Sequence, residues 1–243
     1  MIPCFIVARA RSERFPGKHF EFVYHRMPML EFVVKRCEFF GLKPYVCIPK
    51  DEYDRFFGIT TCLDIFEGDP DNVEARVLEC AHHYQIKAFH QLDADDPLFD
   101  PFAVLDSFNA SQAGRLWRVT PSYHSRAGSG RMGTTYNLSS PTGGDRNLLD
   151  TLQNYPWPQR LTVDYPEDLC LVRMVAETLG GYMAPRSAVD ELFIKNPDLH
   201  RVNWFRNQEW KAHQDAETRW RNRSQSDPGD CQNRIESSSK QNQ

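Results

Sequence analysis

The sequence predicts an α/β protein, a three-layer sandwich in which helices cover both faces of a mostly parallel sheet. Short, continuously apolar runs such as Ile2–Val7 and residues 88–92 have the length and composition of buried parallel strands. Segments with apolar residues at helical spacing lie between these runs, most clearly residues 29–40 and 167–179. This alternation of strand and helix is typical of an open parallel sheet with helices on both sides.

The same patterns place the other elements. Further strands are expected at residues 45–48, 62–66, 116–120, 134–138 and 160–164, and short helices at 51–57 and 187–194. Asp69 with Pro70 is expected to open a helix that reaches about residue 84, and Pro101 and Pro166 each to open another. The glycine-rich segment 121–158 covers a substrate pocket or carries a subunit contact, and the sequence leaves both alternatives open. We expect one domain over 1–214 and a polar, disordered tail over 215–243.

Composition excludes several classes of function. A chain of 243 residues with 40% hydrophobic and 26% charged residues is long enough to bury a core, and its net charge of −4 argues against extensive nucleic-acid binding. The apolar start is too short for a signal peptide, and no apolar run has membrane-spanning length. Seven cysteines without a CxxC pair predict reduced thiols in a cytoplasmic protein, not disulfides or a zinc site.

A basic loop follows the first expected strand. Arg9, Arg11, Arg14 and Lys18 alternate there with small residues, and a Pro-Gly pair precedes the lysine. Cations and a glycine turn at the carboxyl end of a strand suit the binding of a polyphosphate, because backbone N–H groups can approach it closely. The alternative is an ordinary basic surface loop.

Carboxylates follow two other expected strands. Asp93, Asp95 and Asp96 come after residues 88–92, and Asp164 ends residues 160–164. In a parallel sheet these strand ends meet at the same edge as the basic loop, where carboxylates and phosphates together suit Mg²⁺. The alternative is helix capping, which we favour for Asp96 and Asp100, whereas the metal role is favoured for Asp95 and, alongside capping, for Asp164.

Several motifs in the correct order resemble a known family. The chain reads Ala8-Arg9-x-x-Ser12-x-Arg14-x-Pro16-Gly17-Lys18 and later Pro28-Met29-Leu30-Glu31, Asp71-Asn72-Val73-Glu74-Ala75-Arg76, Asp95-x-Pro97-Leu98-x-Asp100-Pro101, Arg160-Leu-Thr-Val-Asp164-x-Pro166-Glu167-Asp168-Leu169, Asn196-Pro-Asp-Leu199 and Val202-Asn203. This series resembles cytidylyltransferases that activate acidic sugars, among them CMP-Kdo synthetases and, more closely, the SpsF-type enzymes of spore-coat polysaccharide biosynthesis. The resemblance covers residues 2 to about 204 and is weakest over 121–158.

The resemblance implies a glycosyltransferase-A-like nucleotidyltransferase fold, transfer of CMP from CTP to an acidic sugar with release of pyrophosphate, and Mg²⁺ as cofactor. It also implies a homodimer and a role in surface-polysaccharide synthesis. Carried over by position, the triphosphate of CTP would be held by Arg9, Arg14 and Lys18, which would also be the catalytic residues. Ala8, Ala10 and Ser12 would lie against the nucleotide, Arg76 near its base or phosphates, and Asp95 and Asp164 would bind Mg²⁺.

The chain departs from the family pattern at Arg11, Asp93 and Tyr165, which leaves the reaction class in place and the identity of the sugar open. Two other functions remain alternatives. One is a nucleotidyltransferase or glycosyltransferase that uses another nucleotide. The other is a non-catalytic nucleotide-binding subunit, which the presence of both Asp95 and Asp164 disfavours.

Overall fold

The computed structural model describes residues 1–122, 133–149, 159–213 and 215–216. The chain divides into two units, Met1–Trp204 and Phe205–Gln243. In the described part of the second unit, residues 206–213 are helical. The expected boundary near residue 214 and the disorder of the tail remain predictions, since residues 217–243 lie outside the described part. No helix among the described residues is long and apolar enough to cross a membrane.

A seven-stranded sheet forms the centre of the first unit, with the strand order β5-β4-β1-β6-β8-β7-β9. Strand β8 runs antiparallel to both of its neighbours, and every other pair is parallel. The strands are β1 (Ile2–Val7), β4 (Leu42–Pro49), β5 (Ile65–Gly68), β6 (Ala88–Asp93), β7 (Arg118–Ser122), β8 (Thr134–Asn137) and β9 (Asp145–Leu149), and a separate two-stranded hairpin joins β2 (Phe22–Tyr24) to β3 (Met27–Pro28).

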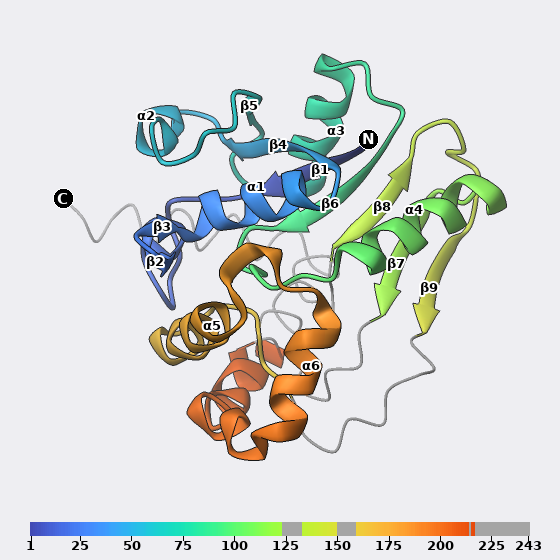
Figure 1. The fold of residues 1–243 in the computed structure, drawn as a ribbon. Coiled ribbons are helices and arrows are strands. Elements are labelled where there is room, and N and C mark those ends of the chain that lie inside the picture. Colours follow the sequence, from blue (N-terminus) through green and yellow to red (C-terminus); the bar gives the residue numbers. More distant parts are fainter. Residues whose placement is uncertain (123–132, 150–158, 214, 217–243) are drawn as a thin grey trace. The chain divides into compact units, whose positions relative to one another are not determined.

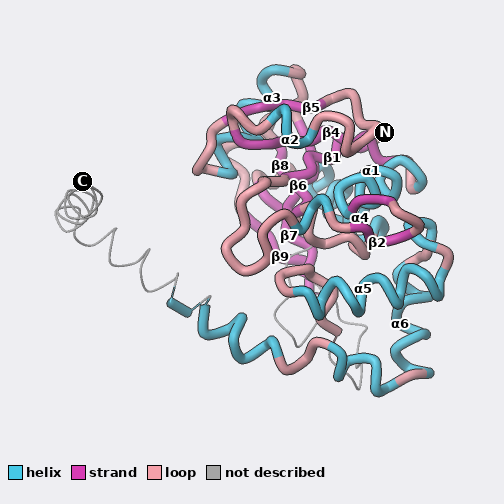
Figure 2. Tube along the Cα trace, turned by 90° about the vertical axis from the view of Figure 1, so that its left-hand side faces the viewer, coloured by secondary structure: helices cyan, strands magenta, loops and turns pink. Residues whose placement is uncertain are grey.

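Helices cover both faces of the sheet, as the alternation of elements predicts (Figures 1 and 2). The helices are α1 (Met29–Phe39), α2 (Tyr53–Phe56), α3 (Val73–His83), α4 (Pro101–Gly114), α5 (Pro166–Leu179) and α6 (Arg186–Lys195), with 3₁₀ turns at Lys18–Phe20, Gly181–Met183 and Pro197–Val202. Successive residues of β1 point to opposite faces. Cys4 and Ile6 join the core beneath α1 and α4, while Phe5 stacks on Phe89 in the core beneath α3. The three-layer arrangement follows from this alternation.

A third core cluster lies between α1, α5 and α6. Met29 and Phe32 of α1 pack there with Leu169, Val172 and Val175 of α5 and with Val189 and Phe193 of α6. The late part of the first unit is therefore attached to α1, the helix that follows the basic loop. This packing brings residues near position 164 close to the loop, although about 150 residues separate them.

Three details of the expected fold are wrong. Residues 160–164 form no strand, and the backbone N–H of Val163 instead donates to the carbonyl of Asp95 at 2.8 Å. Helix α3 begins after Asn72, whose side chain accepts the N–H of Ala75, whereas Asp69 accepts the N–H groups of residues 71 and 72 in the preceding turn. The third apolar run forms a strand over 65–68 and not over 62–66. The alternation of buried residues at 161 and 163 reflects packing against α5, not sheet pairing.

The segment 121–158 contains more structure than its turn-rich sequence indicates. It holds the end of β7 and all of β8 and β9, while residues 123–132 and 150–158 lie outside the described part. Every cysteine in the described residues is free, as predicted.

Candidate active site

The basic loop begins where β1 ends and is built from alternating buried and exposed residues. Ala8 and Ala10 are buried, and Arg9 and Arg11 are exposed. The backbone N–H of Ala8 donates to the carbonyl of Cys47 at 3.1 Å, which extends the pairing of β1 with β4 by one residue. The small side chains let the loop lie against the sheet edge, and the two arginines project from it.

Gly17 turns the chain so that Lys18 enters the interior. Its φ of +73° lies in the left-handed region that glycine adopts without strain, and the 3₁₀ turn Lys18–Phe20 starts directly after it. Lys18 is only 6% exposed. Its ammonium donates to Asp95 Oδ2 at 2.5 Å, to the carbonyl of Val163 at 2.9 Å and to Asp164 Oδ1 at 3.3 Å. One lysine therefore connects the basic loop to both carboxylates that the sequence assigns to the metal.

The electrostatics of this contact favour the charged forms of both partners. Burial works against the Lys18 ammonium, but Asp95 and Asp164 outweigh it and raise the pKa of Lys18. Burial likewise works against the Asp95 carboxylate, yet the adjacent Lys18 holds the pKa of Asp95 below its usual range. Burial, with Lys18 beside it, lowers the pKa of His19 to about 3, so this imidazole is neutral. The site thus keeps a buried ammonium–carboxylate pair across the physiological pH range.

Asp164 is held by cations on two sides. Arg14 Nη2 lies 2.8 Å from Asp164 Oδ1, and Arg160 Nη2 lies 3.3 Å from Asp164 Oδ2. Arg160 is itself fixed by Asp168, with Nε–Oδ1 at 2.8 Å and Nη2–Oδ2 at 3.0 Å. Asp168 also accepts the backbone N–H groups of Asp164 and Tyr165, each at 2.9 Å, and so completes the capping of α5.

Asn203 completes this network from the end of the first unit. Its amide donates to the carbonyl of Arg160 at 2.8 Å and to Asp168 Oδ1 at 2.9 Å. Arg160, Asp168 and Asn203 occur in the motifs quoted above, but sequence reasoning gave them no role. Arg160, Asp164 and Asp168 are spaced four residues apart, and this spacing is the signal that could have linked Arg160 and Asp168 to Asp164.

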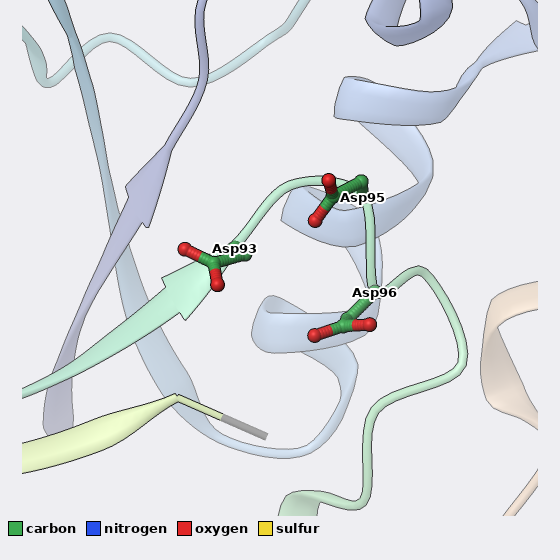
Figure 3. Close-up of side chains that lie close together, drawn as sticks. All are labelled: Asp93, Asp95 and Asp96. Carbon is green, nitrogen blue, oxygen red and sulfur yellow. The ribbon is translucent and has the colours of Figure 1, made fainter. Parts of the chain in front are cut away.

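Three carboxyl groups gather at the end of β6. Figure 3 shows Asp93 at the end of the strand and Asp95 and Asp96 on the turn that follows it. One oxygen of each lies within 4.8 Å of the others. Burial, together with Asp95, raises the pKa of Asp93 to about 7, and it also raises the pKa of Asp96. Carboxyl groups that resist ionisation at such short range suit a divalent cation, which removes their repulsion.

The capping roles predicted for two aspartates have different outcomes. Asp100 caps α4 as expected, since its side chain accepts the N–H of Phe102 at 2.9 Å. Asp96 caps no helix, and its carboxyl group accepts the hydroxyl of Thr162 at 2.5 Å. That bond is a second link, beside the one from Val163 to Asp95, between the acidic turn and the segment that carries Asp164.

The other predicted nucleotide residues lie apart from this cluster. Ser12 stabilises the loop itself, because its hydroxyl accepts the N–H of Phe15 at 3.4 Å. Arg76 is buried, and its guanidinium donates to the carbonyls of Asp69 and Pro70 at 2.8 and 2.9 Å. The structure therefore brings Arg14, Lys18, Asp95 and Asp164 together, and holds Arg76 against the turn before α3.

Comparison with known proteins shows which solved structures share the fold of this chain. No family model and no curated protein matches the chain. Among solved structures, a cytidylyltransferase from Leptospira borgpetersenii superposes with a TM-score of 0.70 at 20% identity, over 82% of this chain and 95% of that one. The chain has the cytidylyltransferase fold.

Other solved structures resemble the chain with lower TM-scores and lower sequence identities. CMP:2-keto-3-deoxy-manno-octonic acid synthetase, solved with CTP, gives a TM-score of 0.53 at 15% identity over 73% of this chain and 99% of that one. Rv0371c of Mycobacterium tuberculosis, solved with manganese, gives a TM-score of 0.51 at 13% identity, over 72% of this chain and 99% of that one. These similarities confirm the predicted fold class, and they also confirm the resemblance to cytidylyltransferases such as CMP-Kdo synthetase.

Proposed function

We propose that this chain is a Mg²⁺-dependent cytidylyltransferase that transfers CMP from CTP to an acidic sugar, of the Kdo type or another ulosonic acid, and releases pyrophosphate. The observation that carries the proposal is the contact of Lys18 with both Asp95 and Asp164, directly below a loop with exposed arginines. Cations that would hold a triphosphate and carboxylates that would hold its metal thus lie near the carboxyl ends of β1 and β6, the edge at which open α/β sheets bind ligands.

The chain's own residues would act mainly through charge. In the proposed reaction a sugar hydroxyl attacks the α-phosphorus of CTP and the bond to the β,γ-pyrophosphate breaks. Arg9, Arg14 and Lys18 would hold the triphosphate and stabilise the negative charge that moves onto the departing pyrophosphate. Ala8 and Ala10 would give the nucleotide a close approach to the backbone, and Ser12 would keep the loop in shape.

A divalent cation fits the oxygen donors at this edge. Asp95 and Asp164 would hold it, with Asp93 and Asp96 beside them, because the three carboxyl groups after β6 already lie within 4.8 Å of one another. When bound, Mg²⁺ would supply further neutralisation of phosphate charge. Arg76 would contribute from the first turns of α3, near the base or phosphates.

Two alternatives use the same fold. The chain could use another nucleotide, as a nucleotidyltransferase or a glycosyltransferase, or it could bind nucleotide without turnover. CTP is favoured because a structural neighbour was solved with CTP and another is named a cytidylyltransferase. A homodimer and a role in surface-polysaccharide synthesis come from the sequence resemblance alone, and the cytoplasmic location comes from the pattern of cysteines.

The test is thermal unfolding of the full chain with CTP, UTP, ATP and GTP, each with and without Mg²⁺, on wild type and Asp95→Asn. A ligand at about 100 times its dissociation constant should stabilise the fold by roughly 2.7 kcal/mol. We expect a shift that is selective for CTP, larger with Mg²⁺, and reduced in Asp95→Asn relative to that variant's own unliganded baseline. Pyrophosphate release with a panel of sugar acids then identifies the acceptor. No shift with any nucleotide would refute the proposal.

A further inference from the structure

Glu52 reaches from the turn after the neighbouring strand to the backbone of the basic loop. Its carboxylate Oε2 accepts the N–H of Ala10 at 2.8 Å, across 42 positions of sequence. Glu52 is half-buried and follows β4, the strand that pairs with β1. The N–H that Glu52 accepts therefore belongs to the residue between the two exposed arginines of the loop.

The turn that presents Glu52 is itself fixed. Asp51 has a φ of +67°, a left-handed conformation that is uncommon for a residue other than glycine. The N–H of Glu52 donates to Pro49 at 3.3 Å, and the N–H of Lys50 donates to Gly68 on β5 at 2.9 Å. A strained residue held by its surroundings is frequent at functional sites. Here it sets the direction from which the Glu52 carboxylate approaches the loop.

The bond to Ala10 fixes the part of the loop that carries charge. Ala10 is buried, while Arg9 and Arg11 on either side are exposed. An N–H bonded to a charged acceptor restrains the plane of the peptide between Arg9 and Ala10, and so the backbone from which Arg9 projects and which leads to Arg11. Without that bond the loop would have to be ordered when the ligand binds, at a cost in affinity.

We propose that Glu52 is a positioning residue for the triphosphate of the bound nucleotide, acting through the backbone N–H of Ala10. The inference rests on the proposed function, since it concerns how the same site binds CTP. The group that Glu52 orients is the basic loop, and the ligand chemistry is that of a polyphosphate.

If Glu52 acted only through its charge, its effect on the affinity for CTP would be opposite to that of the hydrogen bond. Glu52 also lies close enough to Arg76 to interact with it electrostatically, as does Arg9. A carboxylate near cations that bind an anion weakens that binding, so removal of its charge alone should strengthen CTP binding. Removal of the hydrogen bond should weaken it. The two effects can therefore be separated by comparing an amide with a truncated side chain.

The variants are Glu52→Ala, which loses both the charge and the bond, and Glu52→Gln, which keeps an acceptor oxygen for Ala10. Glu67→Ala is the matched control, because the Glu67 carboxylate accepts the backbone N–H of Tyr53 at 3.1 Å in the same corner without contact to the loop. Calorimetric titration of the full chain with CTP and with CMP, both with Mg²⁺, gives the affinities. Hydrogen exchange of residues 8–14 reports loop order without ligand.

We expect Glu52→Ala to bind CTP about tenfold more weakly than wild type, in line with the loss of one hydrogen bond to a charged group. The loss should be smaller for CMP, which lacks the β- and γ-phosphates, and exchange of residues 8–14 should be faster. Glu52→Gln and Glu67→Ala should bind CTP at least as tightly as wild type. Wild-type-like or tighter CTP binding by Glu52→Ala would overturn the role of Glu52 alone, whereas no CTP binding by wild type would refute the proposed function.

Discussion

Replacement of Lys18 by Met tests whether its ammonium holds together Asp95 and Asp164, the two carboxylates proposed to bind the metal. The Lys18 side chain is 7% exposed, and its partners Asp95 and Asp164 are 22% and 5% exposed. Removing one member of a buried ion pair costs about 3–5 kcal/mol, because the remaining charge is left without compensation. The partial exposure of Asp95 places the expected loss for Lys18→Met near the lower end, at about 3 kcal/mol in the free energy of unfolding measured with urea.

Magnesium should reverse part of this loss. A unit charge about 4 Å away in an effective dielectric of about 20 contributes about 4 kcal/mol, so the ammonium of Lys18 opposes a second cation at the same carboxylates. Without it, Asp95 and Asp164 should attract Mg²⁺ more strongly. We therefore expect Mg²⁺ to stabilise Lys18→Met more than it stabilises wild type, and the difference between the two proteins to shrink as Mg²⁺ is added.

Lys35→Met is the control for loss of a lysine ion pair. Lys35 lies 2.8 Å from Glu38, but the two side chains are 30% and 43% exposed, and such surface pairs contribute about 0–1 kcal/mol. The free energy of unfolding of Lys35→Met should differ little from that of wild type, and Mg²⁺ should stabilise both proteins equally. Equal Mg²⁺ stabilisation of Lys18→Met and wild type, or a Lys18→Met protein as stable as wild type, would refute the assignment of these carboxylates to a metal centred near Lys18.

Three further changes test the surroundings of the site. Asp168→Asn should lose about 3 kcal/mol in urea unfolding, because it removes the carboxylate at 2.8 Å from the buried guanidinium of Arg160 and leaves the more distant Asp164 at 3.3 Å. Asp100→Ala should lose about 1 kcal/mol through the missing cap on α4, with the nucleotide-induced shift in melting temperature unchanged. Since the pKa of His19 is lowered from 6.5 to about 3, the unfolded chain binds a proton that the folded chain does not, and stability falls as pH drops below about 6.5. His19→Asn should therefore lose less stability than wild type between about pH 6.5 and 5, where the slope is up to about 1.4 kcal/mol per pH unit.

Each of these has a clear contrary result. Wild-type stability in Asp168→Asn would mean that Arg160 is satisfied without Asp168. A weaker nucleotide response in Asp100→Ala would tie α4 to the site, which its position does not require. Parallel pH–stability curves for His19→Asn and wild type would show that His19 protonates as easily in the folded chain as in the unfolded one.

The sequence predicts those parts of the fold and of the site that depend on local pattern. The apolar run of β1 and the Pro-Gly turn before Lys18 are visible in the sequence, and the rule that parallel strands end at one edge places Asp95 beside the loop. Residues 160–164 show the limit of this reasoning. Their alternation satisfies a strand pattern, yet the buried side chains face α5 and the backbone bonds to Asp95, a partner that no local pattern specifies.

Long-range contacts of polar side chains could not be predicted for the same reason. Glu52 is an unremarkable acidic residue in the sequence, and only the pairing of β1 with β4 brings its carboxylate to Ala10. Asn203 becomes part of the site only because α5 and α6 pack on α1 and return the chain to Asp168. Strand β9 escaped prediction because its sequence, Asp145–Leu149, is polar over its first half, as an edge strand can be.

The charges around Lys18 explain why its replacement is the most informative change. Asp93, Asp95, Asp96 and Asp164 meet Lys18 and Arg14 at one edge of the sheet, so the carboxyl groups outnumber the nearby cations. The pKa of Asp93 is raised to about 7, so protonation of this carboxyl group removes part of the excess negative charge. A bound divalent cation would neutralise the same charge without that protonation. Lys18 and a metal thus stabilise the same carboxylates in alternative or complementary ways. If Mg²⁺ restores the stability that Lys18→Met loses, these carboxylates bind a metal; if it does not, their charge is balanced by protonation together with Arg14 and Arg160.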